Sequence, residues 1–244
     1  MTDRHTMTTL RIMPREMRMM SERILSLTGL PKGFFHATID QVMYSQKLGL
    51  GGFAMLEERF DEMAKASPAS IAIKSESGSM LELDATGQHA WFVLPSLLDL
   101  AGELVARFGE ACITVFNAVD PAELAIAKAI AGRTGLSIEC TDGEVPVLTA
   151  RPQIRTGTVA QDDPTLWALL CDGVQIEADL WWRTYHHAKK ALAADTVVSR
   201  RHAGPMIVNE DGTVIGRKDN DDETDISFLA APSTLNTQGE NAKP

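Results

Sequence analysis

Apolar residues recur at every third or fourth position through the first quarter of the chain, which is the spacing of one face of an α-helix. Two glycine-containing breaks, Gly29–Gly33 and Leu48–Gly52, separate three such stretches, and we predict a helix in each: 15–27, a second from 35 through 43 to the stop signal at Leu48, and 53–66. Several inward positions are methionines, which pack adaptably in protein cores. The pattern therefore predicts an N-terminal helical unit over residues 1–66, packed on the main domain.

After Pro68 the apolar positions change to short runs that are typical of β-strands. Three runs, 70–74, 80–83 and 90–94, are separated by polar turns and predict a meander. Pro95 then begins a predicted helix that ends near Gly109.

The segment 112–140 carries the clearest local pattern. It predicts a buried strand at 112–116, a helix that follows Asp120, and a second strand at 136–140. We expect Asp120 to cap this helix, Pro121 to occupy its first position and Glu123 to complete a capping box. Strand, helix and strand in about 30 residues predict a βαβ unit with parallel strands and a right-handed connection.

The remaining elements are shorter or less regular. We predict one strand at 154–159 in an irregular segment, a helix that begins at Asp163-Pro164, and a longer helix over 174–194. Two short strands around Asn209–Gly212 predict a hairpin. The predicted fold is α/β of the mixed α+β type: an N-terminal helical unit, a mixed sheet with at least one βαβ unit, and a C-terminal helix and hairpin. Residues 67–221 would form the α/β domain, and 222–244 an acidic, largely disordered tail.

Composition narrows the function. The net charge is −10, and half of it lies between Asp219 and Pro244, where six acidic residues face Lys243 alone. No basic stripe suggests nucleic acid binding, and no apolar run is long enough to span a membrane. The widely spaced cysteines form no CxxC motif, so we expect buried, reduced thiols and a cytoplasmic location: Cys112, Cys140 and Cys171.

Candidate chemistry concentrates between Arg183 and His202, where three of the six histidines lie among several cations. Offsets of three and four residues put a polar set on one helix face: Arg183, His186, His187 and Lys190. We expect another face to pack inward: Trp181, Tyr185, Ala188 and Leu192.

A cationic cleft of this kind suits a carboxylate or phosphate, which a guanidinium binds through planar, bidentate contacts. The alternative is a solvated basic face near a helix C-terminus, where cations offset the macrodipole. Under the first interpretation the catalytic residues are Tyr185, His186 and Ser199. The substrate-binding residues are then Arg183, Arg200, Asp219, Asn220 and Asp221.

The sequence contains no recognisable motif for binding a metal or a cofactor. His186 and His187 are adjacent, so their rings point about 100° apart around a helix. The acidic string 219–225 lacks the glycine and the terminal glutamate of a calcium loop. Neither GxxxxGK[ST] nor GxGxxG occurs. We therefore predict no metal and no cofactor.

Four short elements together resemble a bacterial protein family of unknown function: Gly29-Leu-Pro-Lys-Gly33, Arg183-Thr-Tyr185, Thr196-Val-Val-Ser199-Arg200 with Gly204, and Asp219-Asn-Asp221. The resemblance covers about residues 15 to 221. The chain departs from the family pattern in a longer segment after Tyr185 and in the hairpin that precedes Asp219. The resemblance supplies no activity, but it implies that Asp219–Asp221 belong to the folded site and not to the tail.

Two functional hypotheses follow. The first is a metabolic enzyme or enzyme subunit that acts on a small anionic metabolite by a hydrolase- or lyase-like reaction. The second is a non-catalytic accessory or assembly protein, a homo-dimer or the binder of a partner protein. Its partner surfaces would be the Met-rich N-terminal helices and the apolar segment 226–231.

Overall fold

The computed structural model describes residues 8–192, 206–208 and 214–216. The chain divides into two compact units, Met1–Leu192 and Ala193–Pro244. In the second unit, β8 (Met206–Val208) pairs antiparallel with β9 (Val214–Gly216), which confirms the predicted hairpin. The predicted domain boundaries at residues 66 and 221 stay predictions, and the segment 226–231 lies outside the described residues.

The first unit is built around one central helix, α2 (Lys32–Leu48). It packs against α1 (Pro14–Ser26), α3 (Gly52–Glu58) and three helices of the later chain. Its residues 38–45 are nearly all buried, as expected for a helix with neighbours on all sides. The three predicted N-terminal helices are thus confirmed, with a break at Arg59 that sets α3 apart from α4 (Phe60–Met63).

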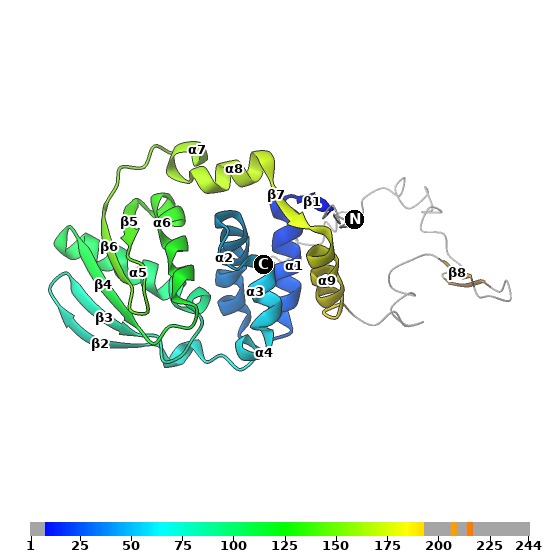
Figure 1. Cartoon of the computed structure of the whole chain (residues 1–244), viewed down its shortest axis with the longest axis horizontal. Helices are drawn as coiled ribbons and strands as arrows, with labels where there is room; N and C mark the ends of the chain where they lie inside the picture. Colours follow the sequence, from blue (N-terminus) through cyan, green and yellow to red (C-terminus); the bar gives the residue numbers. More distant parts are fainter. Residues whose placement is uncertain (1–7, 193–205, 209–213, 217–244) are drawn as a thin grey trace, which may run out of the picture. The chain divides into compact units, whose positions relative to one another are not determined.

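A five-stranded sheet lies beside these helices, in the order β2-β3-β4-β6-β5 (Figure 1). Its strands are β2 (Ala72–Ser77), β3 (Met80–Asp84), β4 (Ala111–Phe116), β5 (Leu136–Cys140) and β6 (Val147–Pro152). The neighbours β3 and β4 are parallel and the other pairs are antiparallel. The helix α5 (Ala90–Phe108) joins β3 to β4 and completes a βαβ unit, so the predicted mixed fold class is confirmed.

The connection after β4 differs in detail from the prediction. It runs through η2 (Pro121–Ala125), α6 (Ile126–Ile130) and η3 (Ala131–Thr134) to β5. The strands β4 and β5 point in the same direction, but β6 lies between them and pairs antiparallel with both. The predicted strand at 154–159 is wrong: β6 ends at Pro152, and Ile154 is 92% exposed.

The prediction of a strand at 90–94 is also wrong, because these residues form the first turns of α5. All five are buried, and a continuous apolar run fits a buried helix as well as a buried strand. His89 caps the helix, its Nδ1 accepting a 3.2 Å hydrogen bond from the Trp91 amide. Pro95 lies inside the helix and does not begin it.

Another correction concerns the residues that follow α8 (Pro164–Asp172). The predicted helix over 174–194 begins only at Ala178, where α9 (Ala178–Lys189) starts. Residues Val174–Glu177 instead form β7, paired antiparallel with β1 (Thr9–Ile12). Gly173, with φ 64°, ends α8 and separates it from this strand. The predicted cap of α8 is confirmed, since Asp163 Oδ1 accepts from the Leu166 amide at 2.8 Å.

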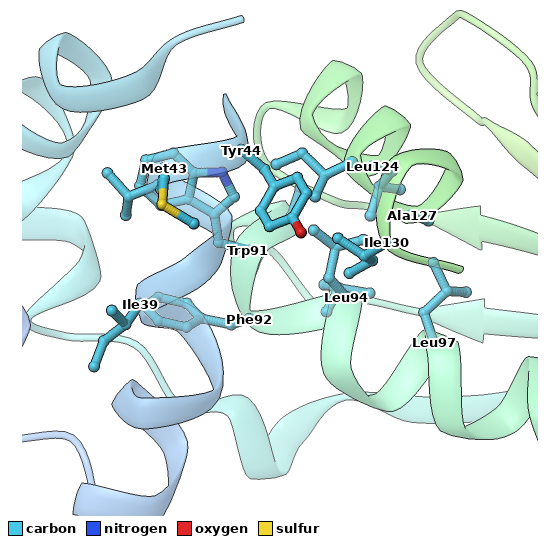
Figure 2. Packing of buried hydrophobic residues seen from close by; sticks show 14 of the residues in the cluster. Ile39, Met43, Tyr44, Trp91, Phe92, Leu94, Leu97, Leu124, Ala127 and Ile130 are labelled. Carbon is cyan, nitrogen blue, oxygen red and sulfur yellow. The ribbon is translucent and has the colours of Figure 1, made fainter. Parts of the chain in front are cut away.

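Helices cover one face of the sheet. Alternate strand residues are buried there, among them Leu83, Val115 and Leu148, and α5 and α6 pack against the strands. Figure 2 shows the core where α2 meets these helices, with Tyr44 and Met43 of α2 near Trp91 and Phe92 of α5 and Ile130 of α6. Within the described residues, no helix combines the length and the apolar character needed to cross a bilayer.

The cysteines correct one further expectation. All three are unpaired thiols, but Cys112 and Cys140 are only half-buried and Cys171 is exposed. Cys112 lies on the strand face opposite the buried Ile113, whereas Cys140 ends β5 on the same face as the buried Leu136 and Ile138. The apolar neighbours of Cys112 in sequence are inward residues and do not indicate that its thiol is inward too.

Candidate functional site

The first helix to consider is α9, which carries the described part of the predicted site. Its buried residues are Trp181, Thr184 and Ala188. Tyr185 and Leu192, predicted to pack with them, are exposed. Spacings of three and four residues from Trp181 lead to Thr184 and Ala188, so a polar residue occupies the packing face and Tyr185 turns to solvent.

The predicted polar face of α9 is divided between solvent and the α3–α4 junction. Arg183, 62% exposed, pairs with Glu57 at 3.3 Å between Nε and Oε2. The His187 ring packs edge-on against Phe60, and burial lowers the pKa of that imidazole. Tyr185 contacts the rings of Trp182 and His186. Ser199, Arg200, Asp219, Asn220 and Asp221 lie outside the described residues, so their convergence with Arg183 stays a prediction.

A cleft of about 430 Å³ lies elsewhere, between α2, α5 and the α6–η3 segment. Its volume falls in the range of small-molecule sites, about 300–1,000 Å³. An apolar wall from Leu98, Ile126 and Ile130 faces several polar groups. The other lining residues are His36, Ala37, Asp40, Gln41, Tyr44, Pro95, Asp99, Arg133 and Thr134.

The polar centre of this cleft is built on Asp163, whose side chain is fully buried. One oxygen caps α8, and the other accepts from the Tyr44 hydroxyl and pairs with Arg133 Nε at 3.2 Å. Burial and the hydrogen bond to Asp163 raise the pKa of Tyr44 far above its ordinary value. Tyr44 therefore keeps its proton and acts as a fixed donor to the carboxylate.

Arg133 is oriented by this arrangement. Its guanidinium carbon lies 5.7 Å from the centre of the Tyr44 ring, and its Nε is engaged by Asp163. A guanidinium has five N–H donors, and the four on the two η nitrogens make no hydrogen bond to another described residue. With 37% of the side chain exposed, this outer edge can bind a carboxylate or a phosphate from the cleft.

The acidic residues of the lining differ in their surroundings. Asp40 is held by Arg18 through two hydrogen bonds of 2.6 Å, so its charge is compensated. Asp99 is exposed and makes no ion pair or hydrogen bond with the described residues. Gln41 is 5% exposed, and its Oε1 is buried without a hydrogen-bond partner among the described residues.

A larger cavity of about 590 Å³ lies beside Gly132, between the end of α2, α6, β5 and α8. Its charged groups are already matched: Lys128 pairs with Glu139 at 2.7 Å. The buried Asp162 accepts from the Thr156 and Gly157 amides and the Thr156 hydroxyl. Because it offers no uncompensated polar group at a buried position, we favour the smaller cleft as the functional site.

A third polar cluster lies where the parallel strands β3 and β4 end. Asp120 does not cap a helix there, which corrects the sequence prediction; its φ is 51°, and its carboxylate binds Arg59 at 3.0 Å and His89 Nε2 at 3.3 Å. Burial lowers the pKa of His89 to about 4 despite the opposing influence of Asp120. His89 is therefore neutral at pH 7, and the charge of Asp120 is balanced by Arg59 within the cluster.

Glu123 also departs from its predicted role. It closes no capping box; its buried carboxylate accepts from Ser45 Oγ, the Gly51 amide and Trp91 Nε1 at 3.0, 2.8 and 2.8 Å. These donors come from elsewhere in the chain, so the interaction holds tertiary structure together and does not start a helix.

Two polar residues of α2 are a signal for the cleft in the sequence. Gln41 and Tyr44 are polar residues three positions apart in a helix whose other residues at 38–45 are mostly buried. Buried polar groups normally have a partner, so such a pair in a central helix indicates a polar site. Arg133 carried no local signal, and Asp163 was identified only as a helix cap. Among the described residues, no group of three His, Cys, Asp or Glu side chains is placed to hold a metal ion.

No protein-family model and no curated protein matches the chain. Among solved structures, it is similar to malate dehydrogenase from Entamoeba histolytica, with 16% identity, a TM-score of 0.46, and coverage of 54% of this chain and 38% of that one. It is also similar to a dehydrogenase from Sinorhizobium meliloti, with 19% identity, a TM-score of 0.45, and coverage of 53% of this chain and 42% of that one. For malate dehydrogenase from Pyrococcus horikoshii, the identity is 14%, the TM-score is 0.44, and the match covers 62% of this chain and 53% of that one. The chain thus spans about half the length of these proteins or less, and the identities and TM-scores are too low to support an argument about family or activity.

Proposed function

We propose that the chain is an enzyme, or a subunit of one, that binds a small anionic metabolite in the cleft between α2, α5 and η3. The observation that carries this proposal is the position of Arg133. Its Nε forms an ion pair of 3.2 Å with the buried Asp163, and the guanidinium, which lines the cleft, makes no hydrogen bond to another described residue through its η nitrogens.

The environment of Arg133 favours a specific anion site over a solvated side chain. Asp163 cannot move easily, because it is fully buried and also caps α8. The Tyr44 ring limits the guanidinium on one side. A planar donor edge that is fixed in advance loses less conformational entropy on binding than a mobile cation does.

The finer proposal, a hydrolase- or lyase-like reaction, requires a group that transfers protons. Tyr44 is unsuited to this role because it holds its proton. His36 lines the cleft and is exposed at its mouth, so we assign proton transfer to it. The set predicted from sequence, with Arg183 and Arg200 as anion ligands and Tyr185, His186 and Ser199 as catalytic residues, is the competing proposal for the same function.

Calorimetric titration with small carboxylates and inorganic phosphate distinguishes the two sites. We expect Arg133→Gln to weaken binding at least tenfold and Arg133→Lys, which keeps the charge but loses the planar edge, to weaken it less. Arg183→Gln is the matched control and should bind as the parent does. The reverse pattern would favour the site predicted from sequence, and a parent that binds none of these anions contradicts the proposal.

A second candidate function, binding of a partner protein, has lost part of its support. Four methionines of the N-terminal helices are buried and offer no partner surface, Met17, Met20, Met43 and Met63, whereas Met19 is 37% exposed. Trp182, however, is 51% exposed and lies against Tyr185 on α9, and exposed aromatic pairs are typical of interaction sites. Light scattering of the parent and of Trp182→Ala tests this: a mass above that of one chain that Trp182→Ala reduces supports an interface at α9.

A further inference from the structure

We infer that the free edge of β5 is a docking site for one extended peptide segment of a partner protein, which would add a sixth strand to the five-stranded sheet. The segment is uncharged and carries apolar side chains at alternate positions. The inference is independent of the anion site at Arg133. It is carried by the backbone of β5 and by the cavity of about 590 Å³ beside it, called the β5 groove below.

The pairing of β5 with β6 determines which of its backbone groups face outward. The Gly135 carbonyl accepts from the Gln153 amide, and the Thr141 amide donates to the Val147 carbonyl. In an antiparallel pair, such hydrogen-bonded positions alternate with positions whose N–H and C=O groups point away from the partner strand. The outward groups make no hydrogen bond to another described residue, and they belong to Leu136, Ile138 and Cys140.

The two edges of the sheet differ in their protection. The strand β2, at the other edge, has an irregular register at Lys74, a second charged residue at Glu76, and no buried residue. Bulges and charged side chains are the means by which natural proteins prevent an edge strand from pairing further. The strand β5 has an uninterrupted register and two buried apolar residues. The edge that can accept a strand is therefore that of β5.

The β5 groove provides space for the side chains of such a strand. It is lined by residues 136–139 of β5, by α6, and by the ends of α2 and α8 that lie nearby. Leu48 and Leu50 in its lining are 41% and 37% exposed, and α6 contributes the small, half-buried Ala125 and Ala129. Alternate side chains of an added strand point to the helical side of the sheet, where they would cover these apolar residues.

The charges of the lining favour an uncharged segment. Lys128 pairs with Glu139 at 2.7 Å. The Asp162 carboxylate accepts three hydrogen bonds from Thr156 and Gly157. These are the charged residues of the groove, so a charged peptide side chain would lose hydration there without gaining a free partner.

The Lys128–Glu139 pair lies across the edge of β5. Glu139 points to the exposed face of the strand, and the neighbouring Ile138 points to the buried face, where α6 packs. The pair therefore reaches around the free edge. Its side chains are 61% and 68% exposed, so it contributes little to stability and an incoming strand can displace it.

A single extended segment suits this edge better than a second copy of the chain. The β5 strand of a second copy would bring its own α6, which packs on the inward face of that strand. On this side the groove is already lined by Leu48, Leu50 and Pro164. A peptide brings no helical layer, and its main-chain hydrogen bonds supply the affinity, as in other cases of strand addition.

Fluorescence anisotropy with synthetic peptides tests the inference. The panel consists of labelled heptapeptides with threonine at odd positions and valine, isoleucine, leucine or phenylalanine at even positions. We expect at least one to bind with a Kd below about 1 mM. Glutamate in place of its apolar residues should weaken binding at least about tenfold.

N-methylated forms of the peptide that binds test the backbone contact. The N–H groups of alternate residues in a strand point to the same edge. N-methylation of either the odd or the even residues should therefore weaken binding at least about tenfold, and N-methylation of the other set should leave it unchanged.

Two pairs of protein variants test the location. Ala129→Arg places a long side chain in the groove and should abolish binding, whereas Ala122→Arg, at an exposed position outside the groove, should bind as the parent does. Cys140→Pro removes one outward N–H group but no hydrogen bond to β6, so we expect binding about fivefold weaker than in Cys140→Ala.

Three results would overturn the inference. The first is that no peptide of the panel binds, and the second is that both N-methylated sets bind equally well. The third is a mass of two chains in light scattering that both Ala129→Arg and Cys140→Pro reduce, because the edge would then belong to a second copy.

Discussion

The indole Nε1 of Trp91 donates a 2.8 Å hydrogen bond to the carboxylate of Glu123, 32 residues further along the chain. The other oxygen of that carboxylate accepts from Ser45 Oγ and from the Gly51 amide. One buried side chain therefore joins the α2–α3 turn, the first turn of α5 and η2. It connects the helical layer to the segment that forms one wall of the cleft.

Replacement of Glu123 tests this connection. In Glu123→Gln, one carboxylate oxygen becomes an NH2 group, which cannot accept a hydrogen bond. At least one of the three groups that donate to Glu123 would then lose its acceptor. We expect a loss of about 3 kcal/mol in the free energy of unfolding, measured by urea denaturation. Glu110→Gln, at an exposed position without a described contact, should change it by less than about 0.5 kcal/mol. Equal effects of the two substitutions would contradict the role of Glu123.

The two tyrosines of the chain provide a second matched pair. Tyr44→Phe removes the buried hydroxyl that donates to Asp163 and leaves the carboxylate with Arg133 and the Leu166 amide. We expect a destabilisation of about 1–2 kcal/mol by urea denaturation. Tyr185→Phe alters an exposed ring and should leave the stability unchanged within about 0.5 kcal/mol. A neutral Tyr44→Phe would show that Asp163 does not need this donor.

His89 predicts a dependence of stability on pH. Its pKa in the folded protein is about 4, below the ordinary value of 6.5, so the folded state disfavours the protonated ring. Above pH 6.5 the imidazole is neutral in both states and costs nothing. As the pH falls from 6.5 to 4, the unfolded state takes up the proton first, and stability is lost by an amount on the order of 3 kcal/mol.

The substitution His89→Asn isolates this contribution, since asparagine can still cap α5 but does not titrate. The difference in unfolding free energy between parent and His89→Asn should shift against the parent as the pH falls from 7 to 4. A parallel course of the His89→Asn and parent curves would mean that the folded protein tolerates a charged His89.

Helices with a clear apolar periodicity or a capping residue were predictable from the sequence. The wrong assignments at 90–94 and 174–177 arose where local sequence does not separate helix from strand. The helices α1 and α2 followed from apolar residues at spacings of three and four, and α8 from the Asp163-Pro164 start. Residues 90–94 are buried on all sides in α5, so they carry no period that could separate helix from strand. Val174–Glu177 become a strand because β1, more than 160 residues away, pairs with them; local propensity contains no such information.

The candidate site was less predictable than the fold. The sequence directed attention to Arg183 and its neighbours because cations cluster there in sequence. The cleft instead assembles Tyr44, Arg133 and Asp163, which lie on separate elements and form no motif. The hydrogen bond between Tyr44 and Asp163 spans 119 residues. Such a site depends on which helices pack together, and that packing cannot be read from the sequence of any one helix.

The close contact between Gly132 and the chain at Asp162 gives the last prediction. A Cβ on Gly132 would lie 2.2 Å from the Asp162 carbonyl oxygen, a backbone atom, so either η3 or α7 (Val159–Asp162) must move. We expect Gly132→Ala to cost about 2 kcal/mol in unfolding free energy. Because Arg133 and Asp163 are the next residues of these two segments, the same shift should also weaken anion binding in the cleft.

Gly102→Ala is the matched control in the interior of α5. A Cβ at Gly102 meets no atom within 4 Å, and alanine is favoured over glycine in a helix interior by about 0.5–1 kcal/mol. The two substitutions add the same methyl group and should change stability in opposite directions, as measured by thermal and urea unfolding. If Gly132→Ala were neutral or stabilising, η3 and α7 would not be in close contact, and the position of Arg133 would not depend on their packing.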